Sequence, residues 1–154
     1  MKKIDFKNKI NFSKINKLKI SKKWIAWLND PKVRRYSTQK IKYNFSKQKI
    51  FLRNKLKDKS SIIFAVFVDS EHIGNLEITR INRFHKHCEI MYLIGEKKYW
   101  NQGLGTIIVE FGVNYARKNL KLKKIIAGTF SDNFSSIKVL KKNNFKIEGK
   151  ISNF

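Results

Sequence analysis

The chain passes from strand to helix in the segment Ile94-Gly95-Glu96-Lys97-Lys98-Tyr99-Trp100-Asn101-Gln102-Gly103-Leu104-Gly105-Thr106. The residues before it, from Glu89 to Ile94, are apolar and rich in Ile and Tyr, as in a buried strand. Apolar residues after it recur at helical spacing, namely Leu104, Ile107, Ile108, Phe111 and Tyr115. The sequence therefore predicts a strand, a turn and a helix that opens with two glycines.

These glycines give the turn the composition of an anion-binding site. A helix start offers unpaired N–H groups and the positive end of the helix dipole. Gly103 and Gly105 would let a phosphate approach that backbone, because they carry no Cβ. The turn lacks both the Gly-Lys-Ser/Thr ending of a P-loop and the G-x-G-x-x-G of a dinucleotide fold. The alternative is a plain helix cap with tolerated glycines.

The residues from Glu89 to Gly95, followed by those from Tyr99 to Thr106, closely resemble the pyrophosphate-binding motif of the GNAT superfamily of acetyl-CoA-dependent N-acyltransferases. The family pattern is Arg or Gln, two residues, Gly, one residue, then Gly or Ala. Trp100 stands in the first position, which resembles the branch that acetylates protein N-termini and amino sugars. The resemblance implies acetyl-CoA as cosubstrate, bound by Asn101, Gln102, Gly103, Leu104, Gly105 and Thr106.

A second segment, from Phe130 to Phe145, resembles the family's Asn-x-x-Ser-Ile-x-Val-Leu-x-x-x-Gly-Phe pattern. Asn144 replaces the usual Gly, a mild change because Asn tolerates the left-handed conformation at a helix end. Asn133 would cap the helix and offer its amide to the pantetheine arm, with Ser136 on the same face. The alternative is that Asn133 is only an N-cap.

The resemblance also implies where the chemistry takes place. In the family, pantetheine pairs with a splayed strand, here Met91, Tyr92 and Leu93, where a backbone N–H can hold the thioester oxygen. Glu89 is the nearest carboxylate on that strand and the candidate general base; the alternative is a structural ion pair with a lysine. Many relatives use a Tyr as general acid at the position of Leu140, so that role is not carried over, and Tyr92 is a weaker candidate.

The acceptor side is indicated by the segment from Trp27 to Val33. It resembles the N-terminal segment of GNAT enzymes that act on amino sugars in surface-polysaccharide pathways, and of their protein N-terminal relatives. We expect Trp24 or Trp27 to stack on a sugar or base, unless both belong to the core. Arg34 and Arg35 are suited to a diphosphate. The expected acceptor is the amino group of a nucleotide-linked amino sugar, and the alternative is a protein N-terminus.

The apolar pattern predicts strands and helices in the order of an α/β (α+β) GNAT fold, with a mixed, mostly antiparallel sheet flanked by helices. We expect one domain over residues 1–154, with the family's last strand missing or shortened. The predicted strands are 4–12, 62–68, 73–81, 87–94, 124–130 and 145–149, and the predicted helices are 21–29, 44–56, 103–119 and 133–143.

The formal net charge of +24 raises an alternative of another class, a basic nucleic-acid-binding module. The 29 lysines are spread along the whole chain, and Lys, Asn and Ile have A/T-rich codons, so composition alone can produce this charge. The positive field should still favour anionic small molecules.

Several further features of the sequence argue against other classes of protein. We find no membrane-length apolar run, no leader and no metal-ligand spacing among His72, His85 and His87. Cys88 is the only cysteine and is expected on the strand face opposite Glu89. These points favour a cytoplasmic enzyme without metal or membrane partner; a homodimer remains open.

Overall fold

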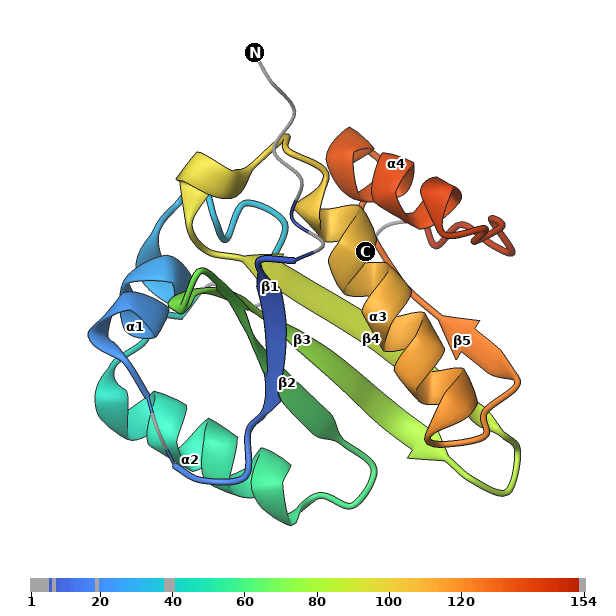
Figure 1. The fold of residues 1–154 in the computed structure, drawn as a ribbon, viewed down its shortest axis with the longest axis horizontal. Coiled ribbons are helices and arrows are strands. Elements are labelled where there is room, and N and C mark those ends of the chain that lie inside the picture. The colour runs from blue at the N-terminus through green and yellow to red at the C-terminus, as the bar shows by residue number, and fades with distance from the viewer. Residues whose placement is uncertain (1–5, 7, 19, 38–40, 153–154) are drawn as a thin grey trace.

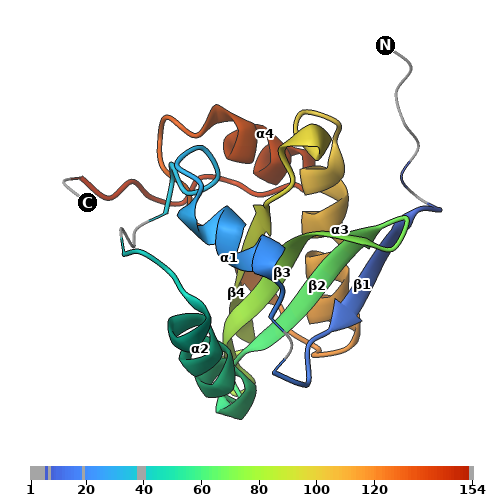
Figure 2. The same ribbon diagram turned by 90° about the vertical axis from the view of Figure 1, so that its left-hand side faces the viewer.

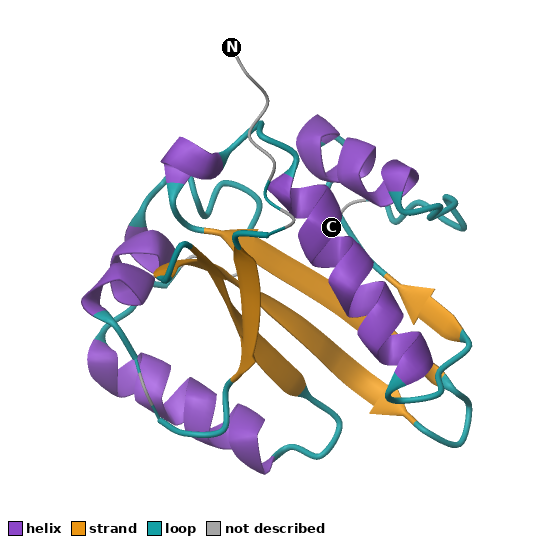
Figure 3. Ribbon diagram, in the orientation of Figure 1, coloured by secondary structure: helices purple, strands orange, loops and turns teal. Residues whose placement is uncertain are grey.

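The computed structural model describes residues 6, 8–18, 20–37 and 41–152. Figure 3 shows helices packed around a central sheet. The strands are β1 Ile10–Lys14, β2 Ile62–Val68, β3 Glu71–Asn82, β4 His87–Ile94 and β5 Lys124–Ile126. The helices are α1 Lys22–Asn29, α2 Phe45–Lys57, α3 Leu104–Lys118 and α4 Phe134–Lys142, with a short 3-10 turn, η1, at Lys97–Tyr99.

The five strands lie in the order β1-β2-β3-β4-β5 (Figure 1). The first four pair antiparallel, and β5 joins the edge parallel to β4. Parallel neighbours need a crossover, which α3 provides by packing across the sheet between them. The predicted mixed, mostly antiparallel sheet flanked by helices is confirmed.

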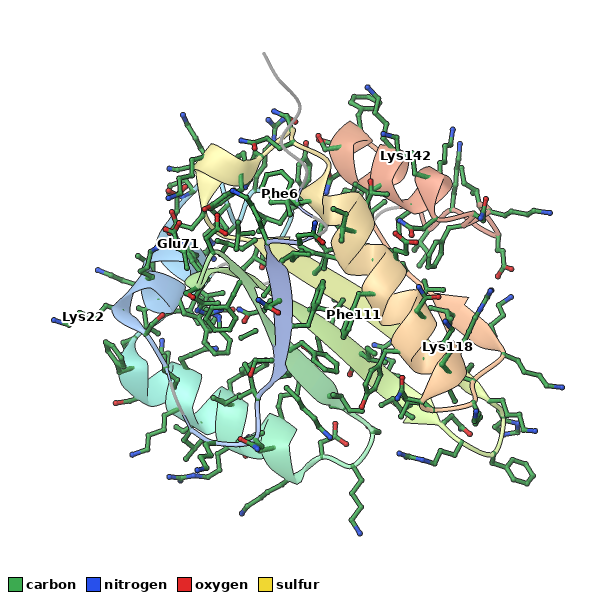
Figure 4. All side chains as sticks on the ribbon, viewed as in Figure 1. Phe6, Lys22, Glu71, Phe111, Lys118 and Lys142 are labelled. Carbon is green, nitrogen blue, oxygen red and sulfur yellow. The ribbon has the colours of Figure 1, made fainter. Side chains whose placement is uncertain are left out.

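Helices cover both faces of the sheet (Figure 2). The larger core lies under α3, where the Phe111 ring stacks on Phe12 at 3.8 Å and meets Phe64 edge-on (Figure 4). The smaller core joins α1 and α2 to the opposite face through Trp24, Trp27, Leu52 and Ile63. Neighbouring residues along a strand point to opposite faces of the sheet, so their side chains enter two separate cores.

Four predicted strands differ from the structure. β3 runs from Glu71 to Asn82, slightly longer than the predicted 73–81. The first strand begins only at Ile10; its predicted positions 4, 5 and 7 lie outside the described residues. β5 ends at Ile126, four residues before the predicted end. The predicted last strand at 145–149 is wrong: these residues are not in a strand, although the ion pair of Glu148 with Lys124 at 2.6 Å ties them to β5. Within the described part of the chain, no helix could span a bilayer.

Candidate active site

A gap opens between β4 and β5 where the two strands diverge. They pair from His87 to Glu89, and no other strand among the described residues pairs with the rest of β4 on that side. The Gly95 N–H donates to the Ile73 carbonyl at 2.9 Å, toward β3. Because backbone groups alternate along a regular strand, the N–H groups of Leu93 and Met91 also face β3, and that of Tyr92 faces the gap. Of the three predicted pantetheine partners, only Tyr92 presents its backbone there.

The turn that leads into α3 is the proposed cofactor cradle. Gly103 has φ +87°, and a Cβ built on it would meet no atom within 4 Å. Asn101 is also left-handed, with φ +60°. The Thr106 N–H donates to the Gly103 carbonyl at 3.0 Å. The N–H groups of Leu104 and Gly105 lie before the first hydrogen bond within the helix. Open space in front of helix N–H groups fits a pyrophosphate.

Gly105 has a packing role that the motif did not indicate. A Cβ there would lie 3.0 Å from a methyl carbon of Val139 and 3.3 Å from the Tyr92 ring. The missing side chain thus allows α3, α4 and β4 to approach closely. The amide of Gln102 is used within the turn, where Nε2 donates to the Lys98 carbonyl, and its buried Oε1 has no partner among the described residues.

Trp100, predicted only as a position in the motif, supports the backbone of β4. Its Nε1 donates to the Ile94 carbonyl at 2.8 Å. By the same alternation, that carbonyl lies on the edge of β4 that faces the gap. The indole therefore satisfies a backbone group that β5 leaves unpaired, and it holds the turn beside the gap.

The N-terminus of α4 meets Tyr92 inside the fold. Asn133 Oδ1 accepts a hydrogen bond from Ser136 N–H at 3.2 Å, which confirms the predicted helix cap. Burial raises the pKa of Tyr92 above its usual value, and the neighbouring Ser136 side chain opposes part of that rise. Tyr92 is therefore a protonated hydroxyl beside the gap, as a proton donor must be.

Glu89 is the last residue of β4 that pairs with β5. Its carboxylate lies 3.2 Å from Arg80 Nη1, so the ion pair considered as an alternative exists, with an arginine in place of a lysine. The Arg80 side chain is 80% exposed and that of Glu89 only 21%. Such an exposed cation is a weak partner, which leaves Glu89 available for proton transfer. Cys88 points into the core under α3, and burial raises the pKa of its thiol to about 11.

Both predicted tryptophans belong to the core. Trp24 and Trp27 are 4% and 5% exposed. Trp27 packs so closely that a Cβ on Gly95 would lie 2.0 Å from its ring, and its Nε1 donates to Glu96 at 2.9 Å. These contacts fix α1 to the end of β4. The expected stacking on a sugar needs an exposed ring face, which neither tryptophan offers; the alternative of a core position is the correct one.

The basic turn after α1 is held at one end of the gap. Arg34 donates to the Ile41 carbonyl at 2.9 Å, and Arg35 lies over the Tyr36 ring at 5.3 Å. The Tyr36 hydroxyl donates to the Asp132 carbonyl at 3.1 Å, in the loop before α4. Residues far apart in the sequence thus place Arg35, which is exposed, beside the loop that leads to the α4 cap.

The three histidines do not gather at the gap. His72 packs against Trp24 and Trp27 beside the smaller core, and burial lowers its pKa. His85 and His87 lie near each other in the β3–β4 hairpin, their rings 6.4 Å apart. The described residues contain no group of three His, Cys, Asp or Glu side chains that could hold a metal ion.

Comparison with known proteins agrees with this geometry. The acetyltransferase (GNAT) domain family matches residues 17–146. The acetyltransferase PseH of Campylobacter jejuni is 31% identical over 139 residues, which cover 89% of this chain and 83% of that protein. Its crystal structure in complex with acetyl coenzyme A superposes with a TM-score of 0.70 at 25% identity, over 93% of this chain and 92% of PseH. The spermidine N-acetyltransferase of Vibrio cholerae, solved with CoA and spermine, has the same fold: TM-score 0.78, 16% identity, 92% and 83% coverage.

Proposed function

The chain belongs to the GNAT acetyltransferase family, and we propose that its acceptor is the amino group of a nucleotide-linked amino sugar. Its activity as an N-acetyltransferase that uses acetyl-CoA follows from the family. The acceptor rests on one observation, the position of the basic turn 31–37 beside the gap. An exposed guanidinium such as Arg35 can pair bidentately with a diphosphate, whereas it would repel a polycation such as a polyamine.

We propose that the reactants meet in the gap between β4 and β5. The cradle at Gly103 holds the pyrophosphate of acetyl-CoA, and the Tyr92 N–H holds the thioester oxygen as negative charge develops on it. Glu89 removes a proton from the attacking amine, directly or through water. The Tyr92 hydroxyl, next to Ser136, returns a proton to the departing thiolate. Asn133 orders this corner through the α4 cap.

The high positive charge does not require a nucleic-acid ligand. Lys22, Lys118 and Lys142 project from three different helices and do not form one patch (Figure 4). A nucleic-acid site would give a steep loss of affinity with rising salt, together with a preference for sequence or structure. We expect only weak, non-specific binding in a salt titration with duplex DNA.

The acceptor can be tested by steady-state kinetics with three amines: UDP-glucosamine, a peptide with a free N-terminus, and spermidine. We expect the highest kcat/KM with UDP-glucosamine. Arg35→Ala should raise the KM for this substrate about 10-fold, as for a lost charge-assisted contact, and leave the KM for acetyl-CoA unchanged. Arg35 is a better target than Arg34, because Arg34 also supports the backbone at Ile41. Equal kcat/KM for spermidine, or no effect of Arg35→Ala, would refute the proposed acceptor.

A further inference from the structure

A row of polar side chains crosses the sheet on the face that carries α1 and α2. Glu77 of β3 accepts a hydrogen bond from Ser61 Oγ at 3.0 Å and forms an ion pair with Lys55 of α2. The same lysine donates to Thr79 Oγ1 at 3.4 Å. The side chains of Glu77 and Lys55 are only 14% and 23% exposed. The sheet thus carries a charged pair largely shielded from water, one strand away from the gap.

The strand register places Glu77 next to the proposed reaction centre. Glu77 lies opposite Met91, and Thr79 lies opposite Glu89. Residues two apart on a strand share a face, so Glu77 and Glu89 are diagonal neighbours on the same face, with backbones about 7–8 Å apart. A primary amine that approaches this face next to Met91 would lie between the carboxylates of Glu77 and Glu89.

This part of the face is open to a substrate. Met91 on β4 and Ile126 on β5 are each 44% exposed, because α1 and α2 pack against β2 and Lys55 of α2 contacts β3. Lys55 and Ser61 both contact the Glu77 carboxylate at Oε1, and a carboxylate has a second oxygen that also accepts hydrogen bonds. Glu77 can therefore accept another hydrogen bond without losing those it has.

Stability alone gives little reason for a charged pair at this position. Removing two charges from water costs free energy that their attraction repays only in part, and apolar replacements of a buried pair are often as stable. The pair does fix the orientation of the Glu77 carboxylate, because Lys55 and Ser61 both restrain its Oε1. A carboxylate held in one orientation positions a substrate through its other oxygen better than a mobile one does.

We propose that Glu77 is a substrate-binding residue that receives the amino group of the acceptor as an ammonium ion. This inference rests on the proposed function and adds a second carboxylate to it. A primary amine with a pKa of about 8–10 arrives mostly protonated at neutral pH. Glu77 Oε2 accepts one charge-assisted hydrogen bond from it, and Glu89 takes the proton whose loss frees the nitrogen lone pair. The second proton, which the nitrogen loses when the amide forms, passes to water, while Tyr92 protonates the thiolate and is reprotonated from solvent. Lys55 and Arg80 balance the two carboxylates, so the row suits one ammonium and not a polycation.

The test compares Glu77→Gln with the double variant Lys55→Met/Glu77→Gln, which leaves no unpaired charge under α2. Glu110→Gln is the control, because it removes an exposed carboxylate on α3. With UDP-glucosamine as amine, both Glu77 variants should raise its KM at least 10-fold and change kcat and the KM for acetyl-CoA less than threefold. The control should behave as the wild type.

Each other outcome has a distinct meaning. A lower melting temperature with an unchanged amine KM in both variants would make the pair a structural anchor for α2 and overturn the proposal. If the wild type prefers the peptide or spermidine, the proposed acceptor fails, but the Glu77 variants are then measured with that amine, since the contact depends only on an ammonium group. An unchanged KM for that amine would again overturn the role of Glu77.

Discussion

Gly103→Ala tests the cofactor cradle with a single added methyl group. The glycine has φ +87°, and the new Cβ would enter the open space before α3 without touching any protein atom within 4 Å. The substitution therefore has two separable effects: backbone strain in the free protein, and a methyl group where a pyrophosphate would approach the N–H groups.

The size of both effects can be worked out. A left-handed alanine costs roughly 1–2 kcal/mol relative to an allowed conformation. For a chain of this size, about 2–4 °C is lost per kcal/mol, so the free protein should melt about 2–8 °C lower. A ligand at 100 times its Kd stabilises the native state by about 2.7 kcal/mol. A 10-fold weaker Kd removes about 1.4 kcal/mol of that, so roughly half of the CoA-induced rise in Tm should disappear.

The assay is a thermal-shift titration with CoA, with the Kd confirmed by calorimetry. Asn144→Ala is the matched control, because Asn144 has φ +62° at the far end of α4 and the substitution adds comparable strain. We expect both variants to melt lower without ligand, and only Gly103→Ala to bind CoA at least 10-fold more weakly.

Two results would refute this reasoning. A wild-type Kd for CoA in Gly103→Ala would show that no phosphate approaches this backbone. An equal loss of CoA affinity in Asn144→Ala would show that general destabilisation, and not the added methyl group, weakens binding.

Three further predictions concern the base, the packing and the surface charge. Glu89→Gln should lower kcat about 10²-fold with little change in the KM for acetyl-CoA, and wild-type kcat at every pH would exclude this residue as the base. Gly95→Ala forces a methyl group into the Trp27 ring and should destabilise the fold by about 1–3 kcal/mol in urea unfolding, whereas Gly149→Ala, with open space around it, should be neutral. Two lysines lower the pKa of Glu71 to about 2, below its unfolded value of 4.5, so its stabilisation is complete above pH 4.5 and is lost as the pH falls toward 2. The difference in unfolding free energy between wild type and Glu71→Gln should therefore shrink between pH 6 and pH 2.5, and a constant difference would contradict the ion pairing.

Local sequence patterns predicted most of the sheet because its strands are consecutive along the chain. β3 and β4 follow one another in a hairpin, so each alternating segment has an adjacent strand to pair with. The tail shows the limit of this reasoning. Residues 145–151 also alternate, with Ile147 and Ile151 outward, and both stay exposed. A strand requires a partner backbone, and alternation in one segment does not supply one.

The candidate site was predicted in part for the same reason. Gly103 and Asn133 act on their own helix ends, so their signals are local and the structure agrees with them. The packing of Gly105 against Val139, and the bond from Trp100 to the Ile94 carbonyl, join elements that meet only in the fold. The sequence marked these positions through the motif but could not show what they contact.

In the proposed mechanism, acetyl-CoA and the acceptor amine approach opposite faces of β4. Tyr92 sends its side chain under α3 toward Ser136 and its N–H into the gap, on the side of the cofactor cradle. Glu89 and Met91 alternate to the other face, where the surface is open and an amine can approach. A strand residue can serve only one face, so acid and base cannot exchange places without a shift of register. In the proposed mechanism, the backbone of β4 therefore separates proton removal from proton return, and we expect the thioester at the strand edge that both side chains can reach.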